Sequence, residues 1–188
     1  MTARIGILSG TFDPIHIGHL ILGETAREQL SLDRVLFMPA GLQWRKTRRE
    51  IASAEHRLAM LRLAIAGNPA FEASTIEVDR AGPSYTADTL EELHSREPDA
   101  ELFFIVGGDA LEDMPNWVRP ERIRELATLA VAARDGDPVG KGAVHLQMPV
   151  IGISATDIRQ RVAAGRSVRY LVPSGLEKYI REHGLYAG

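Results

Sequence analysis

The sequence predicts an α/β fold: a Rossmann-like, doubly wound parallel sheet forming a single domain over residues 1–188. Short apolar runs alternate along the chain with segments of helical periodicity, and strands separated by helices pair in parallel through right-handed crossovers. The residues suited to chemistry follow the predicted strands, and such sheets bind their ligands beyond the carboxyl ends of the strands. An apolar content of 45% in 188 residues suits one domain with a sizeable core.

The predicted strands are short apolar runs, several of them ended by glycine or proline. They are Ile5–Leu8, Val35–Met38, Phe71–Val78, Leu102–Val106 and Leu129–Ala133, with shorter strand-like pieces at Val144–Met148 and Val150–Ile153. Apolar residues at helical spacing predict the helices. These are a segment from about Leu20, Ala54–Ala66, a segment after Thr86, Ile123–Leu126, a segment from Ser154 to about Ala164, and a last one after Pro173. Thr86 and Ser154 are expected to be N-caps.

The stretch Ser9–Leu20 joins the first predicted strand to the first predicted helix. His16 and His19 lie near the start of that helix, where free backbone N–H groups and the helix dipole favour an anion. At this spacing both imidazoles face the same way, and each can donate a hydrogen bond to a phosphate oxygen. Gly10 lets a ligand approach the backbone closely, and Thr11 adds a hydroxyl.

Two plainer interpretations of these histidines stay open. They could be ordinary residues of a helix start, or a metal pair, since two histidines at this spacing can ligate zinc. No third ligand stands nearby in the sequence, and the chain has no cysteine. We therefore expect no metal site made by protein side chains.

A second predicted helix start, Ile153–Arg159, offers another set of phosphate ligands. Ser154 and Thr156 place hydroxyl and N–H groups there, and Arg159 lies one turn further on, where its guanidinium can hold phosphate oxygens in a bidentate way. The alternative is a capping box made by Ser154 and Asp157. The two interpretations are compatible, because cap and phosphate site use the same donors.

These two stretches resemble signatures of the nucleotidyltransferase superfamily, which includes adenylyltransferases and class I aminoacyl-tRNA synthetases. The run His16-Ile17-Gly18-His19 is similar to its HIGH motif. Ile153–Arg159 is similar to its ISSTxIR motif, with Ala155 in place of a serine. The KMSKS motif of the synthetases is absent, which separates this chain from that branch.

Further motifs resemble the bacterial nicotinate-nucleotide adenylyltransferases, in matching order from about Ile5 to Tyr186. They are His56-Arg57, Ser84–Leu90, Phe104–Asp109, Trp117 and Ser167–Pro173. The chain departs from the family pattern at two places. The usual Gly-Gly before the threonine is Ser9-Gly10, and the usual Pro-Pro-His-Lys after the second strand is Gln43-Trp44-Arg45-Lys46. The lysine is kept, whereas the loop around it is expected to be less rigid.

The resemblance implies transfer of AMP from ATP to nicotinate mononucleotide in NAD biosynthesis, with Mg²⁺ accompanying ATP. It implies that His16, His19 and Lys46 are catalytic. It implies that ATP is bound by Gly10, Thr11, Phe12, His16, His19, Gly107, Asp109, Ser154, Thr156 and Arg159, and the mononucleotide by Lys46, Tyr85, Thr86 and Trp117. Trp117 would stack on the pyridine ring, although a half-buried helix aromatic is the plainer interpretation, and Tyr85 could simply pack.

Charge and hydropathy exclude several other classes. A net charge of −3 gives no basic field for nucleic acid, and no apolar run approaches the 18 or so residues of a membrane span. The apolar run near the N-terminus is too short for a signal-peptide core, so we expect a cytoplasmic protein. Two alternative functions stay open: an adenylyltransferase with nicotinamide mononucleotide or dual specificity, and a non-catalytic nucleotide-binding protein of the same fold. Ser84–Leu90 and Trp117 argue against phosphopantetheine, another substrate of the superfamily. The sequence does not exclude a homo-oligomer.

Overall fold

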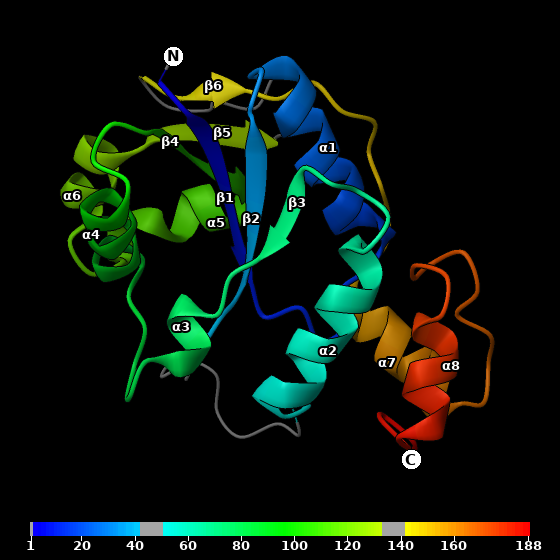
Figure 1. Cartoon of the computed structure of the whole chain (residues 1–188). Coiled ribbons are helices and arrows are strands. Elements are labelled where there is room, and N and C mark those ends of the chain that lie inside the picture. The colour runs from blue at the N-terminus through cyan, green and yellow to red at the C-terminus, as the bar shows by residue number, and fades with distance from the viewer. Residues whose placement is uncertain (1, 42–50, 133–141) are drawn as a thin grey trace.

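The computed structural model describes residues 2–41, 51–132 and 142–188. In these residues six parallel strands form one sheet in the order β3-β2-β1-β4-β5-β6, with the switch point between β1 and β4 (Figure 1). The strands are β1 (Arg4–Gly10), β2 (Arg34–Pro39), β3 (Phe71–Ala73), β4 (Glu101–Gly107), β5 (Thr128–Ala132) and β6 (Val144–His145). The predicted doubly wound α/β fold is confirmed.

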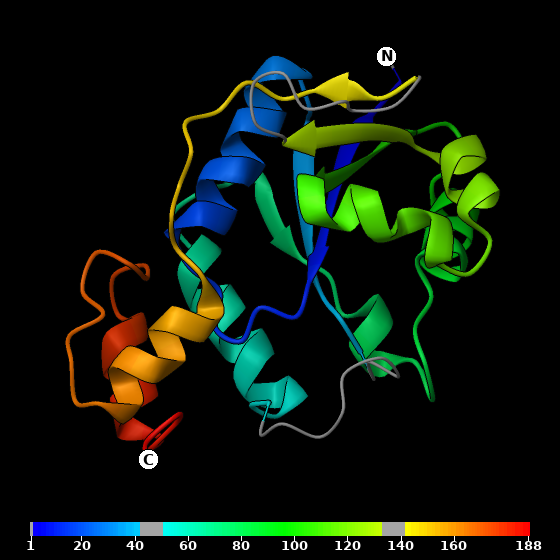
Figure 2. The same cartoon turned by 180° about the vertical axis from the view of Figure 1, so that it is seen from behind.

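Helices cover both faces of the sheet. They are α1 (Ile17–Gln29), α2 (Ala54–Ile65), α3 (Ile76–Asp79), α4 (Thr86–Arg96), α5 (Gly108–Asp113), the 3-10 turn η1 (Met114–Asn116), α6 (Pro120–Leu126), α7 (Ala155–Ala163) and α8 (Leu176–Glu182). In Figures 1 and 2, α1, α2, α7 and α8 lie to one side of the sheet, and α4, α5 and α6 to the other. None of the described helices is both long and apolar enough to cross a membrane.

The alternation of β2 shows why the sheet needs both layers. Val35 and Phe37 pack with residues of α1 and α2, whereas Leu36 and Met38 pack with residues of α4. Successive side chains of a strand point to opposite faces, so an apolar run with no polar alternation must be covered twice. In such a strand, polar residues are expected only at the ends, as Arg34 at the start of β2 shows.

The prediction of a strand over Phe71–Val78 is wrong in its second half. β3 ends at Ala73, and the single helical turn α3 follows. Ile76 packs against the cluster beneath α4, and Glu77 is 5% exposed with its carboxylate hydrogen-bonded to Thr89. A short strand followed by one buried helical turn thus produced an alternation that looked like one long strand.

Two further expectations need correction. Thr86 is the first helical residue of α4 rather than its N-cap, because the Tyr85 carbonyl accepts the first helical hydrogen bond from the Thr89 N–H at 3.1 Å. Val150–Ile153 forms no strand. Val150 is 81% exposed, because the chain has left the sheet edge and runs towards α7 (Figure 2).

Candidate active site

The two histidines of the HIGH-like motif lie against each other at the start of α1. His16 is the N-cap, with extended backbone, and His19 is the third helical residue. Their rings stack with centroids 3.7 Å apart, and the His16 N–H donates to Nδ1 of His19 at 3.2 Å. Because Nδ1 accepts, a neutral His19 carries its proton on Nε2. His19 is thereby fixed as a hydrogen-bond donor through Nε2.

Burial keeps both imidazoles neutral in the free protein. It lowers the pKa of His16 to about 4, and burial together with the neighbouring His16 lowers the pKa of His19 to about 3. Nδ1 of His16 is buried and has no hydrogen-bond partner within the described part of the chain. An unsatisfied buried nitrogen costs about 1–3 kcal/mol, which a phosphate group could offset.

Small and aromatic neighbours fix the positions of the two rings. A Cβ at Gly18 would lie 3.1 Å from Nδ1 of His16, so any other residue there would press against that ring. Phe12 is 2% exposed and meets His19 edge-on, with ring centroids 5.0 Å apart. Its φ of 48° lies in the left-handed region, which the chain adopts to turn from β1 into α1. Phe12 therefore supports His19 from the core.

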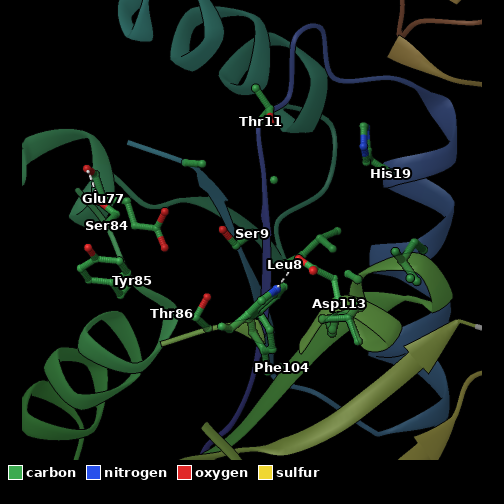
Figure 3. Close-up of a pocket in the computed structure, with 18 of the residues that line it drawn as sticks. Leu8, Ser9, Thr11, His19, Glu77, Ser84, Tyr85, Thr86, Phe104 and Asp113 are labelled. Atoms are coloured by element: carbon green, nitrogen blue, oxygen red, sulfur yellow. Dashed lines mark hydrogen bonds between the residues drawn. The ribbon is translucent and has the colours of Figure 1, made fainter. Parts of the chain in front are cut away.

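A cavity of about 740 Å³ opens at the carboxyl ends of β1, β2 and β4. In Figure 3, His19 lies on the side opposite Glu77, Ser84 and Tyr85, and Thr11 lies between them at the top. Among the predicted site residues, those that line the cavity are Gly10, Thr11, His19, Tyr85, Thr86, Gly107 and Trp117. The structure thus brings together residues that are up to 107 positions apart in the sequence, from Gly10 to Trp117.

Trp117 is held at the cavity wall by two contacts. Its indole N–H donates to Oδ2 of Asp113 at 3.0 Å, and its ring meets Phe104 edge-on with centroids 6.2 Å apart. It also packs against the core cluster beneath α4. Both proposed roles, packing and ring stacking, are therefore compatible with its position.

The sequence analysis missed Glu77 as a cavity residue. Burial raises the pKa of its carboxyl group, and the Thr89 hydroxyl donates to its Oε1 at 3.1 Å. The Ser84 hydroxyl donates to its backbone carbonyl at 3.2 Å. Glu77 is a charged residue at a position of Phe71–Val78 where the alternating pattern predicts a buried side chain. That mismatch was the signal that could have identified it.

The start of α7 lies beside the loop that carries the histidines. Ser154 is the N-cap and accepts from the Asp157 N–H at 3.1 Å. Arg159 donates from Nη2 to the Thr156 hydroxyl at 3.2 Å and from Nη1 to the Asp13 carbonyl at 2.7 Å. Ser154 thus caps the helix as predicted, and Arg159 is anchored to the segment between β1 and α1.

Two predicted residues cannot be placed in this arrangement. Lys46, with the rest of the loop from Gln43, lies outside the described residues, as does the side chain of Asp109. His16 and the polar residues of α7 do not line the cavity. Around the cavity the described residues therefore offer hydroxyls, backbone N–H groups and a neutral imidazole as donors for an anion.

A family model described as Cytidylyltransferase-like matches residues 7–161. A protein of Thermomicrobium roseum named "Probable nicotinate-nucleotide adenylyltransferase" is 49% identical, over 98% of this chain and 92% of its own length. One of Thermus thermophilus with the same name is 50% identical, over 97% and 99%. The chain belongs to the nicotinate-nucleotide adenylyltransferases. The resemblance predicted from the sequence motifs is confirmed.

A solved structure shares the fold of this adenylyltransferase at much lower identity. Plasmodium falciparum nicotinic acid mononucleotide adenylyltransferase, complexed with NaAD, superposes with a TM-score of 0.82 at 16% identity. The alignment covers 98% of this chain and 97% of the Plasmodium chain. The doubly wound sheet is thus common to two sequences that have diverged widely.

Proposed function

We propose that this enzyme transfers AMP from ATP to nicotinate mononucleotide, giving nicotinate adenine dinucleotide and pyrophosphate. One observation carries the assignment within the family. His19, stacked on His16 at the start of α1, lines a cavity whose opposite wall holds Tyr85 and Thr86. The wall at His19 suits the phosphates of ATP, and the wall at Tyr85 and Thr86 suits a pyridine ring that carries a carboxylate.

The chemistry requires positioning and charge stabilisation rather than a base. The 5′-phosphate of the mononucleotide attacks the α-phosphorus of ATP, the α–β bridging bond breaks, and pyrophosphate leaves. A phosphate monoester is already largely dianionic at neutral pH, so no proton has to be removed. His19 donates from Nε2 to the transferring group, while Ser154, Thr156 and Arg159 hold the leaving pyrophosphate, and Lys46 adds a positive charge.

Mg²⁺ belongs to the same proposal. In the described residues no three histidine, cysteine or carboxylate side chains gather as a metal site. An ion arriving with ATP would take phosphate oxygens and water as most of its ligands, which suits the small, strongly hydrated Mg²⁺. Bound there, it would neutralise charge on the phosphates.

The start of α4 supports the choice of an acid substrate. The side chain of its N-cap, Tyr85, does not cap this 11-residue helix, and the N–H groups of a helix start favour a carboxylate. Thr86 adds a hydroxyl at the same place. Glu77 favours a second candidate, nicotinamide mononucleotide, because its carboxylate lines the same wall and could accept from an amide.

Pyrophosphate release decides between these acceptors. ATP and Mg²⁺ are supplied with nicotinate mononucleotide, nicotinamide mononucleotide or phosphopantetheine at equal concentration. We expect a strong preference for nicotinate mononucleotide. Comparable turnover of both pyridine nucleotides would establish dual specificity, and ATP binding without turnover of any acceptor would establish a non-catalytic nucleotide-binding protein.

The proposal extends to the surroundings of the enzyme. We propose a cytoplasmic location, which suits a reaction that consumes ATP. ATP and the mononucleotide are its proposed partners, without nucleic acid or membrane. A homo-oligomer belongs to the same proposal, and the mass of the enzyme in solution tests it.

A further inference from the structure

Asp13 is a buried carboxylate in the segment between β1 and α1, 4% exposed. Its Oδ1 accepts from the Tyr186 hydroxyl at 2.6 Å and from the Ala52 N–H at 3.2 Å. Its backbone carbonyl accepts from Nη1 of Arg159 at 2.7 Å, and the same nitrogen lies 3.8 Å from Oδ2. One residue thus joins the histidine segment, the chain before α2, α7 and the C-terminal residues.

Arg57, on α2, ties two of these segments together a second time. It is 5% exposed and donates from Nη1 to the Thr11 carbonyl at 2.9 Å and from Nε to the Ala52 carbonyl at 3.2 Å. The backbone on both sides of Phe12 is therefore held by side chains from other elements. Arg159 in turn depends on where the Asp13 carbonyl lies.

Tyr186 is anchored by its hydroxyl, its ring and its backbone conformation. Tyr186 has a φ of 61°, in the left-handed region that costs a tyrosine free energy, and its ring packs against the core under α1 and α2. Burial and the neighbouring Asp13 raise the pKa of its phenol, so the hydroxyl stays a donor at neutral pH.

We propose that Tyr186 is a positioning residue: through Asp13 it sets the place of Arg159 and of the loop that receives the ATP phosphates. The C-terminal residues would then be part of the phosphate site although they do not line the cavity. This inference rests on the proposed function only in taking ATP as the nucleotide. It is independent of which acceptor is used.

The chain offers a matched control for this role. Tyr179, on α8, also donates or accepts through its hydroxyl, at 3.0 Å from Nδ1 of His56, and it packs against the same core cluster. Replacing either tyrosine by phenylalanine removes one hydroxyl and one hydrogen bond. Only the Tyr186 hydroxyl touches Asp13.

The test compares the binding of ATP and AMP to wild type, Tyr186→Phe and Tyr179→Phe by calorimetry, with urea unfolding to show that each variant is folded. AMP lacks the β- and γ-phosphates that Arg159 would hold. We expect Tyr186→Phe to weaken ATP binding about tenfold, the scale of a hydrogen bond to a charged group, and AMP binding less than twofold. Tyr179→Phe should change neither.

Equal weakening of ATP and AMP, or no weakening of either, would overturn the positioning role of Tyr186. An ATP-specific loss in Tyr179→Phe as well would also overturn it, because α8 as a whole would then be responsible. Acceptor preference does not enter this readout. A failure of the proposed substrate assignment therefore stays distinguishable from a failure of this inference.

Discussion

His19 combines a defined tautomer with a place on the cavity wall. The N–H of His16 occupies its Nδ1, so a neutral imidazole can only donate from Nε2. Its neighbour Phe12 and the stacked His16 ring leave it little freedom to rotate. A donor held before the substrate arrives stabilises developing charge without reorganisation.

We predict that His19→Ala lowers kcat about a hundredfold or more while the protein stays folded, the scale of losing one preorganised donor. Pyrophosphate release and thermal unfolding measure the two effects. His94→Ala is the control, because His94 is an exposed residue of α4 away from the cavity. A loss under about fivefold would refute the role given to His19.

The same two histidines make stability depend on pH. Their pKa values in the folded protein, about 4 and about 3, lie below the 6.5 of an unfolded chain. As the pH falls through 6.5, these histidines take up protons in the unfolded state but not yet in the folded state. The free energy of unfolding, which is highest above pH 6.5, therefore decreases. At pH 5.5, below the pKa of an unfolded histidine, the loss should be on the order of 1 kcal/mol per histidine.

Urea unfolding at pH 7.5 and 5.5 measures this loss, at pH values above the titration of most carboxyl groups. The variant His16→Gln/His19→Gln should lose less stability than the wild type over the same interval, because neither replacement titrates. Equal losses in the two proteins would show that the histidines are not buried in their neutral form.

Sequence reasoning proposed the local part of the candidate site and did not predict its distant contacts. His16, His19, Ser154 and Thr156 belong to short motifs at helix starts, where spacing alone indicates a shared direction. The contact between Asp13 and Tyr186 joins residues 173 positions apart, and no local pattern encodes it. Only the folded chain shows it.

At the scale of elements, the sequence predicts best where an apolar run is covered on both faces. β1, β2 and β4 were found for this reason, and all three end at the cavity. Short helices and strands were harder to predict from the sequence. α3 is a single turn that continues the alternation of β3, and α5 begins directly after β4, where no helix was predicted.

α7 is an element in which cap and phosphate site coincide. We predict that Ser154→Ala lowers the free energy of unfolding by about 1 kcal/mol, because the Asp157 N–H loses its acceptor, and also raises the KM for ATP. Urea unfolding and steady-state kinetics measure the two effects. Ser95→Ala is the control, because that hydroxyl only donates to the Glu91 carbonyl within α4. A stability loss with unchanged KM would leave Ser154 as a cap alone.

At the scale of the whole molecule, the order of the strands determines where the site lies. β1 and β4 are neighbours although about 90 residues separate them, and their helices cross to opposite faces. The cavity at this switch point is lined by residues of β1, α1, α4 and β4, and by Trp117 and Val118, which follow η1. The residues that line the cavity come from the first two-thirds of the chain, and the proposed phosphate ligands of α7 add a segment from its last third.

We predict that ATP stabilises the whole chain in one step. At a concentration a hundred times its Kd, a ligand that binds only the folded state adds about 2.7 kcal/mol to the free energy of unfolding. For a chain of this size that raises Tm by roughly 5–10 °C. Calorimetric unfolding with and without ATP should show a single transition that moves as a unit. Two transitions, only one of them shifted by ATP, would contradict a single domain over residues 1–188 and would show that part of the chain unfolds independently of the nucleotide site.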